Sequence, residues 1–314
     1  MKIYFPVLFL FLSSCASVPS DAEFPAVDID ESYLKQVVQE LAVNIGPRNL
    51  DHYESLRSAS KYIQGELKKS GFDVELQRYS VLGKKVENII ASIGPKDADR
   101  VVVGAHYDTF GNQPGADDNA SGVAGLIALA KLLKEHEHRL TKRVDLVAFT
   151  LEEPPFFRSK NMGSYVHAKN LSDNKVNVIA MIALEMIGFF SEKEESQDYP
   201  LSILHLFYPD EGNFVGVVSN MSNRGLKSVF RDLMSKSDIE IQSLSAPTWL
   251  AGIDFSDHLN YWEFGYDAIM VTDTAYYRNK NYHQVTDTIE TLNFSKMADV
   301  VQGLFYGVLN LASR

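Results

Sequence analysis

Three predominantly apolar segments constrain the fold of this chain more than any other feature. They are VVVGAHYDT, RVDLVAFTL and NVIAMIAL, which begin at residues 101, 143 and 177. A run without polar alternation is typical of a strand that is covered on both faces. Segments with helical periodicity separate the three runs, at about 119–138 and 161–170. This alternation predicts an α/β fold, a three-layer α/β/α sandwich around a mixed, mostly parallel central sheet.

The flanking segments complete the predicted layers. Apolar residues at three- and four-residue spacing predict amphipathic helices over 31–45 and 53–71, and alternation predicts paired strands over 73–81 and 85–93. LSILHLF (201–207) and YDAIMVTD (266–273) are predicted as strands, and helices are predicted over 212–235 and 293–312. With no internal repeat, one catalytic domain over residues 28–314 is the economical interpretation.

The composition is that of an ordinary globular protein. The chain has 314 residues, of which 45% are hydrophobic and 23% charged, so a sizeable core is possible. The formal net charge of −11 argues against nucleic acid as a partner, because phosphate binding requires a basic surface.

The N-terminus carries an export signal. One cation, Lys2, precedes an apolar run from Ile3 to Leu12 that is too short to remain as a membrane-spanning helix. The run ends in LSSC, which resembles the lipobox of bacterial lipoproteins. That resemblance implies a signal peptide over 1–14, lipidation of Cys15, a tether over 15–27, and a protein anchored to the membrane of the bacterial cell envelope, facing the periplasm or the exterior. The alternative is a plain secretory signal in which Cys15, the sole cysteine, is incidental.

Side chains that can bind metals follow the predicted strands where each one ends, or lie in the loops between them. They are His106, Asp108, Asp117, Asp118, Glu152, Glu153, Glu185 and His283. Each one alone is more often a solvated or structural residue, and an acidic pair such as Asp117 and Asp118 also suits a helix start. The carboxyl ends of parallel strands meet at one edge of a sheet, however, and ligands bind there. The recurrence therefore predicts one shared site.

The donor types predict the metal chemistry. Imidazole and carboxylate donors without a thiolate suit zinc, and also cobalt or manganese. Five ligands exceed the three that a catalytic zinc takes from protein, and a carboxylate shared by two metals accounts for the surplus. One glutamate then remains as a general base. Asp108 lies two residues beyond His106 and faces the same way in an extended strand, so it can orient the imidazole.

Several motifs together resemble the co-catalytic zinc aminopeptidase family, which also includes glutamate carboxypeptidase II and the glutaminyl cyclases. The motifs are IGPRN, NIIASIG, GAHYDT, GADDNASGVA, FTLEE, LEMIGFF, SDHLNYWEFGYDAIMVTD and YHQVTDTIETL. The similarity runs from about residue 40 to 313. It implies a zinc-peptidase (phosphorylase/hydrolase-like) fold, two zinc ions and peptide substrates.

Carried over by position, the resemblance assigns a role to each candidate. The implied metal ligands are His106, Asp118, Glu153, Glu185 and His283, with Asp118 bridging both ions; Glu152 is the implied general base and Asp108 the acid behind His106. The family more usually has Asp at the position of Glu185. The peptide after Asp118 is typically cis in this family.

Other interpretations remain open from the sequence. A glutaminyl cyclase, which needs one zinc, and a non-catalytic lipid-anchored binding module are the two rivals. Aminopeptidase is preferred over carboxypeptidase by default, because no arginine cluster is obviously placed to grip a C-terminal carboxylate. Arg158 and Arg278 nevertheless keep carboxypeptidase open. Phe156 and Phe157 either line a substrate pocket or pack in the core. Neither substrate preference nor oligomeric state is predicted.

Overall fold

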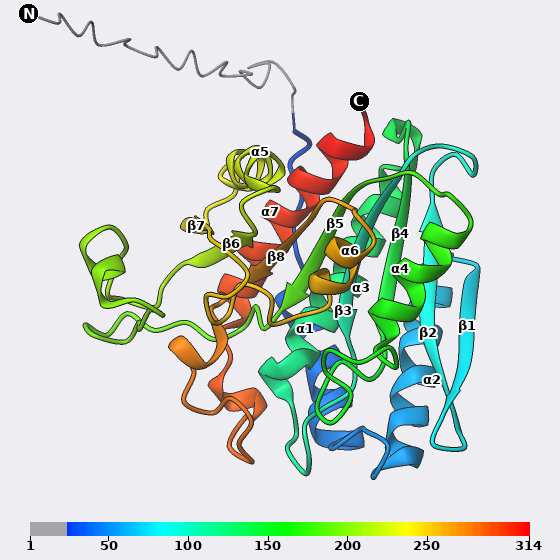
Figure 1. Ribbon diagram of the computed structural model, residues 1–314, viewed down its shortest axis with the longest axis horizontal. Helices are drawn as coiled ribbons and strands as arrows, with labels where there is room; N and C mark the ends of the chain where they lie inside the picture. Colours follow the sequence, from blue (N-terminus) through cyan, green and yellow to red (C-terminus); the bar gives the residue numbers. More distant parts are fainter. Residues whose placement is uncertain (1–23) are drawn as a thin grey trace, which may run out of the picture.

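An eight-stranded mixed sheet forms the centre of the computed structural model, which describes residues 24–314 (Figure 1). The strands run in the order β1-β2-β4-β3-β5-β8-β6-β7. Their bounds are β1 (Val74–Val81), β2 (Lys84–Ile93), β3 (Arg100–His106), β4 (Arg143–Phe149), β5 (Val178–Glu185), β6 (Val215–Ser219), β7 (Ile241–Ser245) and β8 (Ala268–Thr272). The central strands β4, β3, β5 and β8 are parallel, and β1 and β2 pair antiparallel to their neighbours. β6 runs antiparallel to β8 and parallel to β7.

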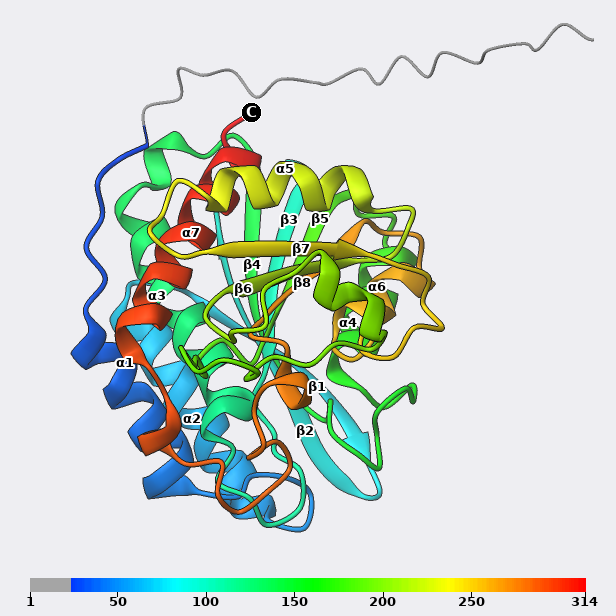
Figure 2. The ribbon, with the colours of Figure 1, turned by 90° about the vertical axis from the view of Figure 1, so that its left-hand side faces the viewer.

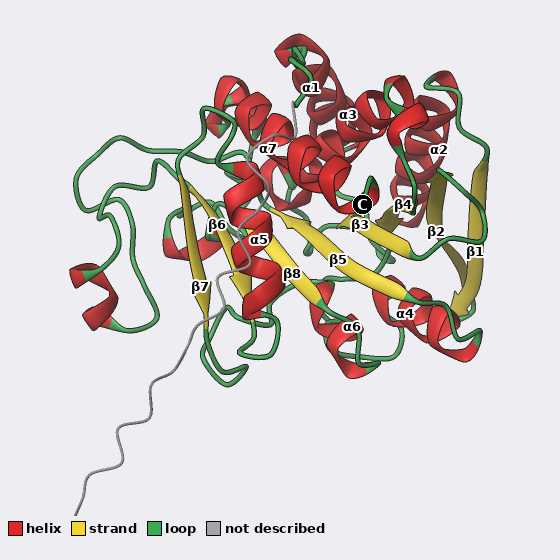
Figure 3. Cartoon of the chain, turned by 90° about the horizontal axis from the view of Figure 1, so that it is seen from above, coloured by secondary structure: helices red, strands yellow, loops and turns green. Residues whose placement is uncertain are grey.

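Helices cover both faces of the sheet, as Figure 3 shows. The helices are α1 (Glu31–Val38), α2 (Tyr53–Lys69), α3 (Gly122–Glu135), α4 (Gly163–Asp173), α5 (Arg224–Met234), α6 (His258–Glu263) and α7 (Phe294–Ala312). α4 and α6 lie on one face, and the other five lie on the opposite face. The predicted α/β class and its three-layer sandwich are therefore confirmed.

The apolar runs behave as predicted because helices cover them on both sides. In β3, Val101 and Val103 pack into the larger core under α3 and α7, whereas Val102 packs into the smaller core under α4 and α6. A strand enclosed in this way exposes no polar face, and this explains its uninterrupted apolar sequence.

The predictions for residues 201–245 are partly wrong. LSILHLF forms a 3₁₀ turn (Ser202–Leu206) and not a strand, and its apolar side chains face solvent, Leu206 at 77% exposure and Phe207 at 74%. In the region predicted to be helical, 212–235, the first part forms strand β6 and only the second part forms helix α5. Strand β7 was not predicted. Alternating apolar residues form a strand only where a neighbouring strand pairs with them, and this segment lies away from the sheet edge. Figure 2 looks onto that edge, with α5 alongside β7.

The described chain begins against α7. The ring of Phe24 packs 5.0 Å from the ring of Tyr306, and the Gln302 side chain donates a hydrogen bond to the carbonyl of Val27. The predicted signal peptide (1–14) and Cys15 lie outside the described residues. Across residues 24–314, every helix is too short or too polar to cross a membrane.

Candidate metal centre

The predicted ligands come together at the carboxyl ends of the central strands. His106 is the last residue of β3, and Glu185 is the last residue of β5. Glu152 and Glu153 follow β4, Asp118 lies in the turn before α3, and His283 lies in the long loop between β8 and α7. The donor atoms form two groups, each with all members within 4.8 Å of one another: His106, Asp118 and Glu185 in the first, and Asp118, Glu153 and His283 in the second.

Asp118 belongs to both groups and lies between the two histidines. Its Oδ1 is 3.4 Å from Nε2 of His106, and its Oδ2 is 3.4 Å from Nε2 of His283. Glu185 Oε2 lies 3.4 Å from the same nitrogen of His106, and Glu153 Oε2 lies 3.2 Å from that of His283. One carboxylate therefore presents one oxygen to each of two donor sets, as a carboxylate shared by two metals does.

Unpaired polar atoms support a cation site here. Asp118 Oδ2, Glu153 Oε1 and His283 Nε2 are buried, and none has a hydrogen-bond partner among residues 24–314. Buried polar atoms are normally hydrogen-bonded, so three of them in one place call for a ligand. Imidazole nitrogens and carboxylate oxygens are donors that suit zinc, and the residues fit that ion.

Several acidic side chains are buried together in the site, and this shifts their pKa values. Burial raises the pKa of Glu152 well above its usual value and the pKa of Glu153 to about 8. Burial acts to raise the pKa of Asp118 too, but the attraction of the His106 and His283 imidazoles, each 3.4 Å from one of its oxygens, outweighs burial and lowers that pKa. A bound divalent cation would favour the ionised form of every carboxylate around it.

Asp108 holds the glutamate pair. Its Oδ1 and Oδ2 each accept a hydrogen bond, from the backbone N–H of Glu152 and of Glu153, both at 3.1 Å. The predicted support of His106 by this carboxylate is looser, because Oδ1 is 3.6 Å from Nδ1, beyond hydrogen-bond length. The closer partner of that nitrogen is the backbone oxygen of Asp108, at 3.2 Å.

The side chains of Asp117 and Asp118 point in different directions and have different partners, so the two acids have separate roles. Asp117 accepts hydrogen bonds from the backbone N–H of Gly188 at 3.0 Å and from Nδ2 of Asn279 at 2.7 Å, away from both donor groups. Neither acid caps α3, which has no side-chain cap. The peptide between Asp118 and Asn119 is cis, as the resemblance implies.

Three residues that were not predicted as part of the site hold its ligands in position. Asp287 accepts hydrogen bonds from the backbone N–H groups of Asp117 and Asp118, at 2.9 and 3.1 Å. Ser256 Oγ donates to Glu185 Oε2 at 2.7 Å. Arg48 is fully buried, and its guanidinium donates to the carbonyls of residues 107, 114 and 115, which border the His106 and Asp118 segments. Arg48 and Asp287 both lie in motifs that were recognised, but the sequence offered no signal of their contacts.

The remaining candidates have structural partners. Arg278 is buried and donates to Gln197 and to two backbone carbonyls, so it cannot grip a substrate carboxylate; Arg158 is half-exposed and pairs with Asp254 at 2.7 Å. Phe156 packs in the core. Phe157 does not belong to that core, and its ring contacts the ring of Phe255.

Comparison with known proteins identifies the family. The model of peptidase family M28 matches residues 88–306, which include every candidate ligand. The chain belongs to peptidase family M28. This M28 peptidase is 44% identical over 280 residues to the uncharacterized protein YfbL of Escherichia coli K12, covering 86% of this chain and 85% of that one. It is 28% identical to a probable leucine aminopeptidase of Trichophyton verrucosum, and spans 54% of that relative's length.

Solved structures share the fold of this M28 peptidase. A zinc aminopeptidase from Bacillus subtilis superimposes with a TM-score of 0.72 at 16% identity, over 91% of this chain and 96% of that one. A glutaminyl cyclase from Bacteroides thetaiotaomicron superimposes with a TM-score of 0.67 at 18% identity, over 91% and 99% of the two chains.

Proposed function

We propose that this M28 peptidase is an aminopeptidase that removes N-terminal residues from peptides with a two-zinc site. His106 and Glu185 would hold one ion, Glu153 and His283 the other, and Asp118 both. The position of Asp118 between two histidine-containing donor sets carries this proposal. The similarity to a probable leucine aminopeptidase, and to the fold of a zinc aminopeptidase, supports it.

The chemistry divides between the ions and Glu152. Two zinc ions in such a site polarise the substrate carbonyl and lower the pKa of the attacking water. Glu152 belongs to neither donor group, yet its Oε2 lies 3.9 Å from Nε2 of His106. It is therefore free to accept the proton of that water and to pass it to the leaving amine. Asp108 orients it through the backbone bond described above.

A panel of peptides tests the activity. The purified protein, supplied with zinc, is expected to release the N-terminal amino acid from unblocked peptides and to leave N-acetylated ones intact. Glu152→Gln should retain its zinc and lose about a hundredfold or more in turnover. Absence of hydrolysis across the panel, or full activity in the variant, would contradict the assignment.

A glutaminyl cyclase is the second candidate, since one such enzyme shares the fold. In that reaction the amine of the substrate attacks, and one zinc suffices. The two donor groups around Asp118 favour the two-metal reading. Pyroglutamate released from a glutaminyl peptide, with about one zinc per chain, would support the cyclase instead. A binding module without activity would have no use for Glu152.

We also propose that Cys15 is lipidated and anchors the enzyme to the cell envelope. The described chain starts beside the C-terminal half of α7. The end of α7 contacts the segment that precedes β4, where Thr141 and Lys142 donate to the carbonyl of Ala312. Figure 1 shows both termini of the described chain at this end, opposite the carboxyl ends of the strands. The anchor would therefore leave the metal centre facing away from the membrane. Replacement of Cys15 by Ser should release the protein from membranes.

A further inference from the structure

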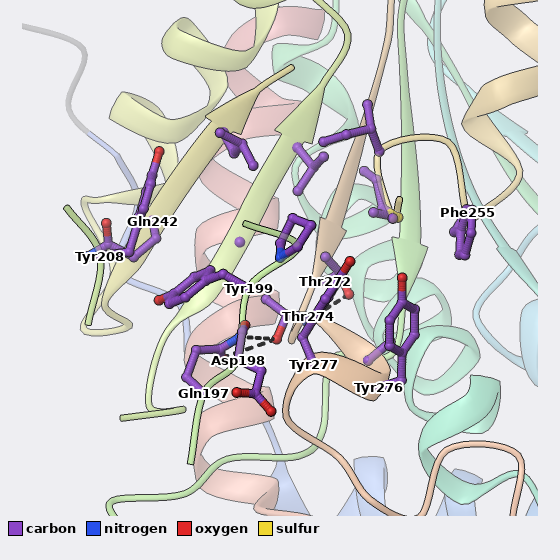
Figure 4. A pocket seen from close by; sticks show the side chains of 18 of the residues that line it. Gln197, Asp198, Tyr199, Tyr208, Gln242, Phe255, Thr272, Thr274, Tyr276 and Tyr277 are labelled. Carbon is purple, nitrogen blue, oxygen red and sulfur yellow. Dashed lines mark hydrogen bonds between the residues drawn. The ribbon is translucent and has the colours of Figure 1, made fainter. Parts of the chain in front are cut away.

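A pocket adjoins the candidate metal centre at Glu185 (Figure 4). It opens to solvent, and the space between its walls, open solvent included, is about 730 Å³. Its floor is the face of β8, β6 and β7 that is turned away from α5 and α7. Val215 and Val217 of β6 point into the core on the α5 and α7 side, whereas Gly216 and Val218 line the pocket.

The sheet register aligns this floor with the metal centre. Glu185 pairs with Thr272 of β8, Thr272 pairs with Gly216 of β6, and Gly216 pairs with Gln242 of β7. Paired residues on neighbouring strands present side chains on the same face, and all four of these line the pocket. Neighbouring strands lie about 4.8 Å apart, so Gly216 lies about 10 Å from Glu185 along this row.

Gly216 leaves a gap in the row. Its neighbours on the same face, Phe214 and Val218, both carry apolar side chains into the pocket. The backbone at Gly216 has no left-handed φ, and a Cβ there would meet nothing closer than the carbonyl of Thr272 at 3.4 Å. Neither the backbone conformation nor crowding therefore requires glycine at position 216. The absence of a side chain there keeps the pocket deep.

The walls of the pocket are aromatic rings. Tyr199, Tyr208, Phe255, Tyr276 and Tyr277 surround it (Figure 4). The hydroxyl groups of three of them donate to backbone carbonyls: Tyr199 to Pro209, Tyr208 to Ser243, and Tyr277 to Ala251. With these polar ends engaged elsewhere, the tyrosines contribute mainly ring surface, which packs well against another aromatic ring.

Hydrogen bonds hold the wall in place. The segment that carries Tyr199 is fixed through Gln197, whose Nε2 donates to Thr274 Oγ1 at 2.9 Å and whose Oε1 accepts from Arg278 Nε at 2.8 Å. Arg278 and Gln197 are both buried. The pocket is therefore formed before a ligand arrives, which reduces the entropy cost of binding.

We propose that this pocket binds the side chain of the substrate residue whose carbonyl is attacked, and that it selects large aromatic side chains, with Gly216 setting its depth. The inference rests on the proposed aminopeptidase activity, because it takes the metal centre as the position of that carbonyl. A side chain directed along the row passes Thr272 and ends over Gly216, between the aromatic walls. Burial of such a side chain removes its apolar surface from water, which favours binding.

Replacing Gly216 with valine tests the depth of the pocket. Valine suits a strand, and its side chain would project into the pocket. Wild-type protein is expected to cleave phenylalanyl-nitroanilide with a kcat/KM at least about tenfold above alanyl-nitroanilide. In Gly216→Val the phenylalanyl value should fall by about tenfold or more, while the alanyl value stays within about twofold. An unchanged ratio of the two values would overturn the proposal.

The matched control is Gly225→Val, on α5, where a Cβ meets nothing within 4 Å and no pocket is affected. It should keep the wild-type ratio.

A second readout needs no turnover. L-phenylalaninol should raise the melting temperature of wild type and of Gly225→Val but not that of Gly216→Val. If no aminoacyl substrate is cleaved and this protection still depends on Gly216, the activity is wrong and the pocket assignment stands. If cleavage occurs without preference for phenylalanine, the pocket assignment is wrong and the activity stands.

Discussion

Asp287 holds the backbone of Asp118 in place: its Oδ2 accepts the Asp118 N–H at 3.1 Å. The other oxygen, Oδ1, accepts the N–H of Asp117 at 2.9 Å. The shared carboxylate of the candidate metal centre is thus positioned by an acid that contributes no atom to either donor group. Mutation of residues that orient metal ligands in this way commonly lowers metal affinity by about 10–100-fold.

Replacement of Asp287 by Asn should therefore weaken metal binding. An amide has one acceptor oxygen, so one of the two backbone bonds is lost, and zinc affinity is expected to fall by about 10–100-fold. Zinc titration by competition with a chromophoric chelator measures the change. Asp232→Asn on the surface of α5 is the control, and equal affinities in the two variants would contradict the positioning role.

Removing the metal should lower stability. The buried acid Asp118 has a ligand oxygen within 4.8 Å of one in Glu185 and of one in Glu153, and these carboxylates need cations to offset their charge. A ligand present at about 100 times its Kd stabilises the folded state by about 2.7 kcal/mol. For a domain of this size, that raises the melting temperature by about 5 °C or more. Thermal unfolding with and without EDTA measures this. Asp118→Asn should be insensitive to EDTA, and an equal shift in that variant would show that the chelator acts elsewhere.

The convergence of His106, Glu153 and Glu185 could be predicted because it follows from topology, whereas Asp118 and His283 lie outside the strands and their roles were implied by the family resemblance. Parallel strands bring their carboxyl ends to one edge, and the apolar runs marked which strands were parallel. Asp287, Ser256 and Arg48 could not be found in this way. Their contacts depend on how loops far apart in the chain approach each other, and a single sequence does not encode that distance in any periodic pattern.

The pocket beside Glu185 was equally invisible in the sequence. Its floor includes β6 and β7, short strands in which Gly216, Gln242 and three serines weaken the apolar alternation. The exposed LSILHLF segment has the stronger strand pattern but lies away from the sheet. Pairing partners, and not local propensity, decided both cases.

A buried ion-pair network gives the fold a defined dependence on pH. Asp145 of β4 binds Arg100 at 2.9 Å, Arg143 at 2.7 Å and Ser92 at 2.6 Å. Burial acts to raise the pKa of Asp145, but Ser92 and Arg143 outweigh it, and the pKa lies below its usual value. Because the unfolded chain then binds the proton more tightly, this group stabilises the fold above about pH 4, and the contribution is lost as pH falls through the folded pKa.

Asp145→Asn should consequently be less stable than wild type by about 2 kcal/mol at pH 7. Below about pH 4 the difference should shrink, because Asp145 of the unfolded wild-type chain then gains a proton that the folded protein takes up only at a lower pH. Urea unfolding of both proteins in EDTA, which keeps metal binding out of the comparison, measures the two free energies. A difference that is independent of pH would show that the ionised carboxylate is not the source of the stabilisation.

The central claim is that Asp118 joins two metal ions. Anomalous diffraction at the zinc edge, from crystals grown with zinc, measures this directly. We expect two peaks about 3.5–4 Å apart, one beside each histidine, with one oxygen of Asp118 in contact with each. A single peak, or two peaks of which only one contacts Asp118, would contradict the account.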